Sequence, residues 1–276
     1  MNTRLRSPLD KAGRILLAAF LLFCALFAFI PFVYMFLLSL TQSKSLYFNM
    51  GDLSFDFLNY LRVFRNTNFL SALKNSMIVT GSACILNCVL SSMAAYGFAK
   101  KKFPGNRLLF RIYLTTLMIP GQVTLIPVFA IMKNIGLLNT YPALSLIIVN
   151  AFGVFLIHQF MENVPDELLE AAKIDGCPEF QIFFRIVIPL IRPVLVSLTI
   201  FTFITSWNDF IWPLVIVTNS KMNTLTLELS LLKGQFATNY GLVMAGSTLS
   251  FIFPFILYIL LQKQFVEGIA LSGIKG

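Results

Sequence analysis

Long apolar stretches separated by short polar segments dominate the sequence. Six of them reach the length at which an α-helix crosses a bilayer, about 20 residues. They lie at residues 15–40, 72–98, 108–132, 141–161, 191–217 and 242–262. The pattern predicts an all-α integral membrane protein with six transmembrane helices, the first of which we expect Pro31 to kink.

The first apolar stretch follows four basic residues, Arg4, Arg6, Lys11 and Arg14. It is longer than the apolar core of a signal peptide, and it lacks the small-residue cleavage site that such a peptide carries. We therefore expect a retained first helix, preceded by a cytoplasmic segment at residues 1–14.

Six spans place both termini on one side of the membrane, and the distribution of basic residues indicates which side. With the N-terminus inside, 14 of the 21 Lys and Arg residues fall in inside segments and 7 in outside segments. Cytoplasmic loops carry the excess of basic residues in membrane proteins. Cytoplasmic N- and C-termini are thus predicted, with a membrane domain at residues 15–262, a cytoplasmic loop at 163–189 and a cytoplasmic tail at 263–276.

Composition agrees with a membrane protein and argues against several functions. Hydrophobic residues make up 57% of the chain and charged residues 12%, about half the charge of a soluble domain. The net charge of +9 comes from short basic clusters beside apolar stretches, which suits membrane anchoring and argues against nucleic acid binding. The sequence has no phosphate-binding loop, so we do not expect this chain to bind ATP. We also expect no other bound cofactor and no catalytic residue in it.

Cysteine and histidine leave little room for a metal site. The cysteines are Cys24, Cys84, Cys88 and Cys177. Cys84 and Cys88 are one helical turn apart, so a metal pair is conceivable, but no His, Asp or Glu lies near them on that helix. Small buried residues are the favoured interpretation. We expect the single histidine, His158, to be hydrogen-bonded at a helix interface near the cytoplasmic end of the fourth span.

Polar residues inside two apolar stretches fall on single helical faces. One face carries Ser76, Thr80, Asn87 and Ser91, and the other carries Thr199, Thr202, Ser206 and Asp209, flanked by Trp207 and Asn208. Polar residues in a membrane either hold helices together or line a watery path. We favour helix packing for the first face and a path wall for the second. The candidate path residues are Asn87, Ser206, Trp207, Asn208 and Asp209.

The loop at residues 163–189 is a well-punctuated polar segment. Pro165 suits a first helical position, and Asp166 and Glu167 suit the positive end of a helix dipole. Gly176 suits the residue just after a helix end, and Pro178 then starts a second helix. Two short amphipathic helices on one side of a membrane indicate a docking point for a soluble partner.

The same loop carries a motif of defined spacing. Glu170-Ala171-Ala172 is followed after three residues by Gly176, and after nine more by Ile186-Val187-Ile188-Pro189. This resembles the inner-membrane permease subunits of ATP-binding-cassette (ABC) importers, whose motif is Glu-Ala-Ala, three residues, Gly, nine residues and Ile-x-Leu-Pro. Ile188 in place of Leu is the one departure. The resemblance covers nearly the whole chain and is strongest to the maltose-type (MalG-like) carbohydrate branch.

The resemblance implies a type I ABC importer (MetI-like) permease fold in a bacterial or archaeal plasma membrane. It implies a heterodimer with a second permease subunit, two ATPase subunits that carry ATP and Mg, and an extracytoplasmic solute-binding protein. It further implies that segment 218–240 contacts the binding protein and that the tail reaches between the ATPase subunits. The residues that it assigns to coupling with the ATPase are Glu170, Ala171, Ala172, Asp175, Gly176 and Pro189.

The cargo that the resemblance implies is a sugar, in the first place an oligosaccharide. Glycerol phosphate, a polyamine or another small solute is an alternative that keeps the same machinery. An ion-driven secondary transporter would need a buried ion site and usually an inverted repeat. A membrane-embedded enzyme would need a catalytic cluster, and the sequence shows none of these features.

Overall fold

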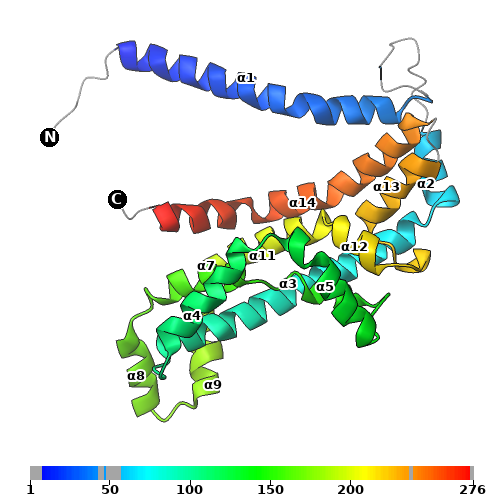
Figure 1. Ribbon diagram of the computed structural model, residues 1–276. Helices are drawn as coiled ribbons and strands as arrows, with labels where there is room; N and C mark the ends of the chain where they lie inside the picture. Colours follow the sequence, from blue (N-terminus) through cyan, green and yellow to red (C-terminus); the bar gives the residue numbers. More distant parts are fainter. Residues whose placement is uncertain (1–7, 43–46, 48–56, 236–238, 274–276) are drawn as a thin grey trace. The chain divides into compact units, whose positions relative to one another are not determined.

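The computed structural model describes residues 8–42, 47, 57–235 and 239–273, and most of this part is helical (Figure 1). The start of the predicted cytoplasmic segment, the last three residues of the tail and residues 236–238 of the predicted binding-protein contact lie outside the described residues. The helices of the first part of the chain are α1 (Pro8–Ser39), α2 (Leu58–Asn66), α3 (Phe69–Lys100), α4 (Asn106–Thr115), η2 (Thr116–Met118), α5 (Gly121–Asn134), α6 (Tyr141–Leu146) and α7 (Ala151–Met161). The second part has α8 (Asp166–Ile174), α9 (Glu179–Gln181), η3 (Ile182–Val187), α10 (Ile188–Leu190), α11 (Arg192–Trp207), α12 (Ile211–Ile216), η4 (Ser220–Met222), α13 (Leu225–Gln235) and α14 (Tyr240–Gly273).

Helix length and composition identify fewer membrane spans than the six predicted. Three described helices are long and apolar enough to cross a membrane: Gly13–Ser39, Phe69–Lys100 and Tyr240–Gln262. Two bent pairs of helices raise the number to five if each pair is one span. The last helix continues past the predicted end of its span at residue 262 and reaches Gly273.

The third predicted span is broken rather than continuous. The helical segments Asn106–Met118 and Gly121–Asn134 meet at an angle of 102°. Pro120 disfavours the helical conformation at the residue before it, and Ile119 accordingly has the extended angles φ −90° and ψ 115°. Pro120 also lacks the amide hydrogen that would continue the helix. The local chemistry of one proline thus divides this span.

The fourth and fifth predicted spans are also divided. Helix α6 ends at Leu146, and α7 starts at Ala151 after Asn150, whose side chain accepts hydrogen bonds from the amides of Phe152 and Gly153. In the fifth span, α11 ends at Trp207 and α12 starts at Ile211. These short helices need their polar ends satisfied by side chains, because backbone groups left unpaired in a bilayer are costly.

The chain divides into two compact units. The first unit (residues 1–67 and 232–249) contains α1, α2, the end of α13 and the beginning of α14. Within it, the buried Asn59 donates from Nδ2 to the carbonyl oxygens of Ser39 at 2.9 Å and of Thr41 at 2.7 Å. A Cβ added at Gly241 would collide with the Thr41 carbonyl oxygen and with Asn59. Glycine at this position therefore allows α14 to approach the segment after α1 closely.

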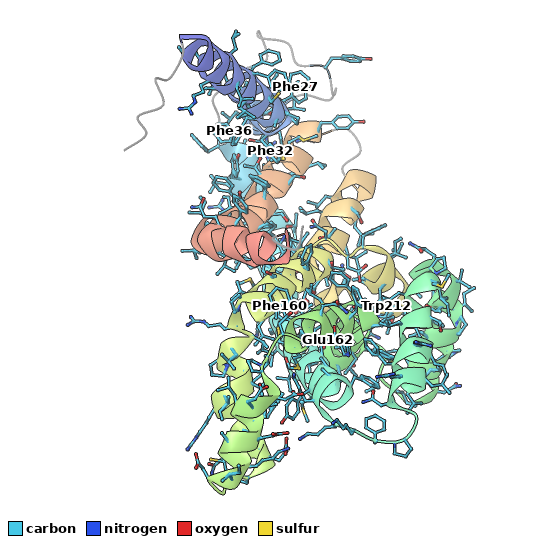
Figure 2. The ribbon with its side chains drawn as sticks, turned by 90° about the vertical axis from the view of Figure 1, so that its left-hand side faces the viewer. Phe27, Phe32, Phe36, Phe160, Glu162 and Trp212 are labelled. Carbon is cyan, nitrogen blue, oxygen red and sulfur yellow. The ribbon has the colours of Figure 1, made fainter. Side chains whose placement is uncertain are left out.

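Helix α1 presents apolar side chains around its whole circumference. None of its most apolar window is buried within the chain, and Figure 2 shows Phe27, Phe32 and Phe36 projecting from it. The exposed fractions of these three side chains are 66%, 40% and 44%. A helix that is apolar on all sides belongs in lipid or against another protein.

The second unit (residues 68–231 and 250–276) is built around α3. Helix α3 packs against α6, α7 and α11. One core cluster joins the end of α3 to α7, α8, η3 and α11 through residues that include Tyr96, Ile157, Leu169, Ile182 and Leu198. A second cluster joins α3 to α6 and α12 through Val79, Leu144, Trp212 and Ile216. The loop at residues 163–189 is thus packed in the same body as α3, the central helix of this unit.

Candidate coupling loop and polar helix interface

The first helix of the loop, α8, begins one residue later than its sequence predicts. Pro165 occupies the N-cap position with φ −60° and ψ 131°, and Asp166 is the first helical residue. Its end has a Schellman geometry. The amides of Gly176 and Cys177 donate to the carbonyls of Lys173 and Ala172, and Gly176 has φ +79°. Gly176 is therefore required by its left-handed backbone conformation.

The two faces of α8 differ in character. Leu169 and Ala172 are buried against the rest of the unit. Glu170, Ala171 and Asp175 are exposed, and Ile174 nearby is 86% exposed. A single exposed apolar side chain is ordinary on a protein surface, so the features that suit this face to a close contact are the small Ala171 and the carboxylates of Glu170 and Asp175. The exposed face of α8 has the chemistry of a docking surface.

The end of α3 is connected to the start of α8 by Lys100. Its Nζ donates to the Val164 carbonyl at 2.6 Å and to Asp166 Oδ1 at 2.8 Å. This hydrogen bond, together with the charge of Lys100, holds the pKa of the Asp166 carboxyl below its ordinary value. The Asp166 side chain is 70% exposed, so the pair positions the loop more than it stabilises the fold.

A second connection reaches the other helix of the loop. Glu179 accepts hydrogen bonds from the Tyr96 hydroxyl and from Lys101 Nζ, and the Lys101 ammonium lies 4.8 Å from the centre of the Tyr96 ring. The Tyr96 ring also contacts Phe183, with ring centres 5.2 Å apart. Sequence reasoning did not identify Lys100, Lys101, Tyr96 or Glu179 as loop contacts. The basic run that ends α3 is the signal that could have suggested them.

After α9 the loop passes through the π-helical turn η3 before α10, which contains Pro189. Ile182, Phe183 and Val187 are buried there. Segments Glu179–Leu190 and Arg192–Trp207 meet at 77°. Pro189 is exposed at this corner, so the last residue of the motif lies where the loop returns to a membrane helix.

The two polar faces predicted from sequence lie against one another. Asn87 donates from Nδ2 to Thr202 Oγ1 at 2.9 Å and accepts at Oδ1 from Ser91 Oγ at 2.9 Å. Ser206 Oγ donates to Thr80 Oγ1 at 3.2 Å. All five side chains are buried, which is the arrangement of a polar contact between helices.

A small cavity of about 80 Å³ borders this contact. Asn87 and Thr202 line it, and so do Asn150 and Thr205, which sequence reasoning did not select. Asn150 is recognisable in sequence as a polar residue inside the fourth apolar stretch, and Thr205 lies beside Ser206. Among the predicted path residues, Asn87 both lines this cavity and forms a hydrogen bond with α11.

The other predicted path residues have separate positions. Trp207 is 3% exposed and contacts the rings of Phe203 and Phe253. Asn208 is exposed, and Asp209 is half-buried and accepts from the Trp212 amide at 3.3 Å. The structure thus gives Ser206 and Trp207 packing contacts inside the chain, and it leaves Asn208 on the surface.

Cys84 and Cys88 face α11. The Cys84 Sγ donates to the Thr199 carbonyl at 3.6 Å, and Cys88 Sγ lies 3.3 Å from Thr199 Oγ1. In the described part of the chain no group of three or more His, Cys, Asp or Glu side chains is placed to hold a metal ion. Both thiols act in this structure as small residues at a helix contact.

His158 differs from its prediction. The ring is 8% exposed and stacks on Phe110 with ring centres 4.1 Å apart. Its Nδ1 has no hydrogen-bond partner among the described residues. The expectation of a hydrogen-bonded interface histidine was therefore wrong for Nδ1, because this buried atom meets no donor or acceptor in the plane of the ring among the described residues.

An importer membrane component is the class of protein that this fold and loop define. The chain belongs to the family of binding-protein-dependent transport system inner membrane components, whose model matches residues 87–270. Members of this kind are the permease subunits of ABC importers and are not enzymes.

Individual relatives match along most of the chain. The arabinooligosaccharides transport system permease protein AraQ of Halalkalibacterium halodurans is 35% identical over 265 residues, which is 94% of each chain. The melibiose/raffinose/stachyose import permease protein MelC of Bacillus subtilis is 30% identical over 281 residues, covering 99% of this chain and 100% of the relative. A crystal structure of a bacterial ABC transporter involved in the import of the acidic polysaccharide alginate contains a chain with TM-score 0.80 and 25% identity. That match covers 95% of this chain and 100% of the other.

Proposed function

We propose that this chain is the permease subunit of an ABC importer for an oligosaccharide. The names of relatives such as AraQ and MelC support a sugar of more than one unit. The exposed amides of Asn150 and Asn208 and the exposed hydroxyl of Thr205 are suited to a hydroxyl-rich solute. Glycerol phosphate, a polyamine or another small solute would use the same machinery and is the alternative cargo.

The observation that carries this function is the α8 helix of the coupling loop, anchored on one face and open on the other. Glu170, Ala171, Asp175, Gly176 and Pro189 are the exposed residues that we assign to the contact with an ATPase subunit. Ala172, predicted with them, is buried and holds α8 against the packed body instead. Small Ala171 permits close approach, and the Glu170 carboxylate can pair with a basic group of the partner. Because Lys100 and Lys101 connect the loop to α3, a displacement of α8 moves the end of the central helix with it.

The coupling mechanism follows from these contacts. ATP and Mg bind to two ATPase subunits, which close and draw the coupling loops of the two permeases together. A ligand shifts a conformational equilibrium only through contacts that differ between the two states. The contact of α8 with the ATPase provides that difference, and the packed body around α3 transmits it to the helices around the path.

The assembly has a second, different permease subunit and an extracytoplasmic solute-binding protein. Six spans with cytoplasmic termini place the coupling loop inside the cell, where the ATPase subunits are. A bacterial or archaeal plasma membrane is the location. Segment 218–240 faces outside and contacts the binding protein, and the tail extends towards the ATPase subunits.

The path for the solute passes Asn87 and the end of α11 at Asn208 and Asp209. Alanine at both 208 and 209 should alter the concentration dependence or the sugar preference of uptake, since the Asn208 side chain is exposed and the half-buried Asp209 carboxylate lies next to it. Ser206 and Trp207 contribute by holding the helices that border the path. Unchanged uptake and preference in the double variant would remove positions 208 and 209 from the path.

The coupling assignment is tested in proteoliposomes that contain the whole importer, internal ATP and the binding protein. Glu170→Lys reverses a charge on the docking face. Gly176→Pro cannot adopt the positive φ and loses the amide that bonds Lys173. Both variants should remain in the membrane, while uptake falls to the level without ATP.

A matched control is Arg65→Glu, which makes a charge change of the same size on the last turn of α2. It should keep normal uptake. Normal uptake in both loop variants would disprove the docking role.

The energy source and the cargo are tested separately. Uptake that needs an ion gradient and no ATP would identify a secondary transporter. A cargo screen with oligosaccharides, glycerol phosphate and a polyamine shows which solute is carried.

A further inference from the structure

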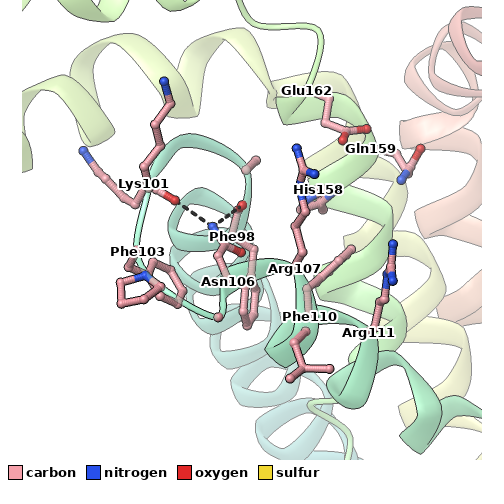
Figure 3. A pocket seen from close by; sticks show the side chains of 15 residues that line it. Phe98, Lys101, Phe103, Asn106, Arg107, Phe110, Arg111, His158, Gln159 and Glu162 are labelled. Atoms are coloured by element: carbon pink, nitrogen blue, oxygen red, sulfur yellow. Dashed lines mark hydrogen bonds between the residues drawn. The ribbon is translucent and has the colours of Figure 1, made fainter.

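A pocket of about 1000 Å³ lies where α3 ends and α4 begins. The segment between α3 and α4, the first turns of α4 and the last turn of α7 form it (Figure 3). Asn106 fixes this segment, because its Nδ2 donates to the carbonyl oxygens of Phe98 at 3.0 Å and Lys101 at 2.6 Å. The pocket therefore has a defined wall on the α3–α4 side.

The lining is strongly basic. It contains Lys101, Lys102, Arg107 and Arg111, against one carboxylate, Glu162. Arg107 and Arg111 are exposed and form no ion pair within the described part of the chain. The first turn of α4 has no acidic residue and no side-chain cap, so the positive end of its dipole adds to the same field.

A buried group without a partner also borders the pocket. His158 lines it, is 8% exposed and has an Nδ1 atom with no hydrogen-bond partner among the described residues. Figure 3 shows His158 on α7 and Arg107 on α4 among the side chains that line the pocket. A buried polar atom left unpaired costs free energy, and an oxygen acceptor in the pocket would satisfy an Nδ1–H donor.

Apolar side chains form the edge of this basic pocket. Phe103 and Leu108 line it and are 40% and 63% exposed. One turn further along α4, Ile112 is 55% exposed. The candidate span Phe69–Lys100 ends immediately before Lys101. Basic groups at the end of a membrane helix, next to exposed apolar ones, lie at the depth of lipid headgroups.

We propose that this pocket binds the phosphate of an anionic phospholipid, with the phosphodiester between Arg107, Arg111 and His158 and an acyl chain along Leu108 and Ile112. Guanidinium groups bind phosphate oxygens through charge-assisted hydrogen bonds. The apolar edge favours a lipid over free phosphate, which has no acyl chain to contact it. The side of the membrane follows from the proposed topology, whereas the binding chemistry does not depend on it or on the cargo.

The consequence for the importer comes through Lys101. This residue lines the pocket and also pairs with Glu179 of the coupling loop. A bound anionic headgroup would attract the same ammonium group that connects the loop to α3. The lipid is therefore placed to adjust how firmly the loop is held.

The test is native mass spectrometry of the purified importer in detergent with added phosphatidylglycerol, compared with phosphatidylcholine. The chain should retain phosphatidylglycerol in preference to phosphatidylcholine. Arg107→Gln combined with Arg111→Gln should weaken this binding about tenfold or more, since two charge-assisted contacts are lost. Both side chains are exposed, so the fold should tolerate the change. His158→Phe keeps a ring against Phe110 and should also weaken binding.

The matched control is Arg62→Gln with Arg65→Gln on α2, which removes the same charge elsewhere and should keep the lipid bound. Equal binding of phosphatidylglycerol by the Arg107/Arg111 variant and the control would overturn the proposal. Equal retention of the two lipids by the unaltered chain would overturn it as well. Displacement of the lipid by millimolar inorganic phosphate or glycerol phosphate would show a soluble phosphate site and so contradict the lipid assignment. None of these measurements uses transport, so failure of the proposed function would not affect them.

Discussion

Both ends of the Asn87 carboxamide are occupied, by Thr202 and by Ser91. Inside a bilayer such a group needs partners, because water is not available to provide them. Sequence periodicity identifies the face on which Asn87 lies, but it does not say whether a helix or a watery path supplies the partners. In the structure Asn87 contacts a neighbouring helix at Thr202 and also lines a small cavity.

Gly153 adjoins this hydrogen-bonded group. A Cβ added there would lie 2.5 Å from Ser91 Oγ and 2.8 Å from Asn87 Oδ1. Gly153→Ala should therefore separate α7 from α3 and lower the free energy of unfolding by about 1–3 kcal/mol, as overpacking does. The measurement is the unfolding midpoint of the purified importer in detergent.

Gly81→Ala is the matched control, because this α3 position has nothing within 4 Å of an added Cβ. It should be neutral or slightly stabilising, since alanine favours a helix by about 1 kcal/mol over glycine. Equal midpoints for Gly153→Ala and the unaltered protein would show that the α3–α7 contact adjusts to the methyl group.

At the scale of elements, the sequence predicted the helices better than their breaks. The apolar stretches locate α1, α3 and α14. In these helices the long run of apolar residues outweighs the weaker helix propensity of individual residues. The bend at Pro120 follows from proline chemistry, but Pro31 lies inside a continuous α1, so proline alone does not decide where a helix divides. The break before Asn150 depends on a side-chain cap and on packing against α3, which hydropathy does not report.

The cap of α7 provides an element-scale prediction. Asn150 Oδ1 accepts from the amides of Phe152 at 3.0 Å and Gly153 at 3.3 Å. Asn150→Ala should cost about 1 kcal/mol of unfolding free energy, because these amides lose their acceptor. Thermal unfolding of the assembled importer measures the loss.

Asn150→Ser keeps a capping oxygen and should recover most of the stability. If serine and alanine were equally destabilising, the role of Asn150 would lie in the adjoining cavity instead of the cap.

At the scale of the whole molecule, the spacing of Glu170, Gly176 and Pro189 in the loop was enough to predict the family. The division into two units was not predictable, because it depends on contacts between residues far apart in sequence. The exposed surface of the single chain includes polar residues within predicted spans, such as Gln122 and Asn208. Lipid does not hydrogen-bond such groups, so they indicate surfaces that face the proposed second permease or the proposed solute path.

Expression of the chain without the proposed second permease tests this surface. The single chain should be degraded faster than the same chain co-expressed with the second permease, because its polar membrane surface lacks partners. Pulse-chase labelling in the native host measures the two half-lives. Equal half-lives would mean that the chain is complete in lipid alone.

The π-helical turn η3, from Ile182 to Val187, affects how insertions and deletions in the motif would act. A π turn contains one residue more than an α turn, since its bonds run from residue i to i+5 instead of i+4. Deleting one residue here would let the segment become an α-helix of the same length in space. The chain on either side would then keep nearly its present orientation, because the π turn already absorbs one extra residue. The same deletion within an α-helical part of the motif would instead rotate the following chain by about 100°, one residue step of an α-helix. The nine residues between Gly176 and Ile186 thus run into the π turn, and the segment that tolerates a one-residue deletion best is this turn.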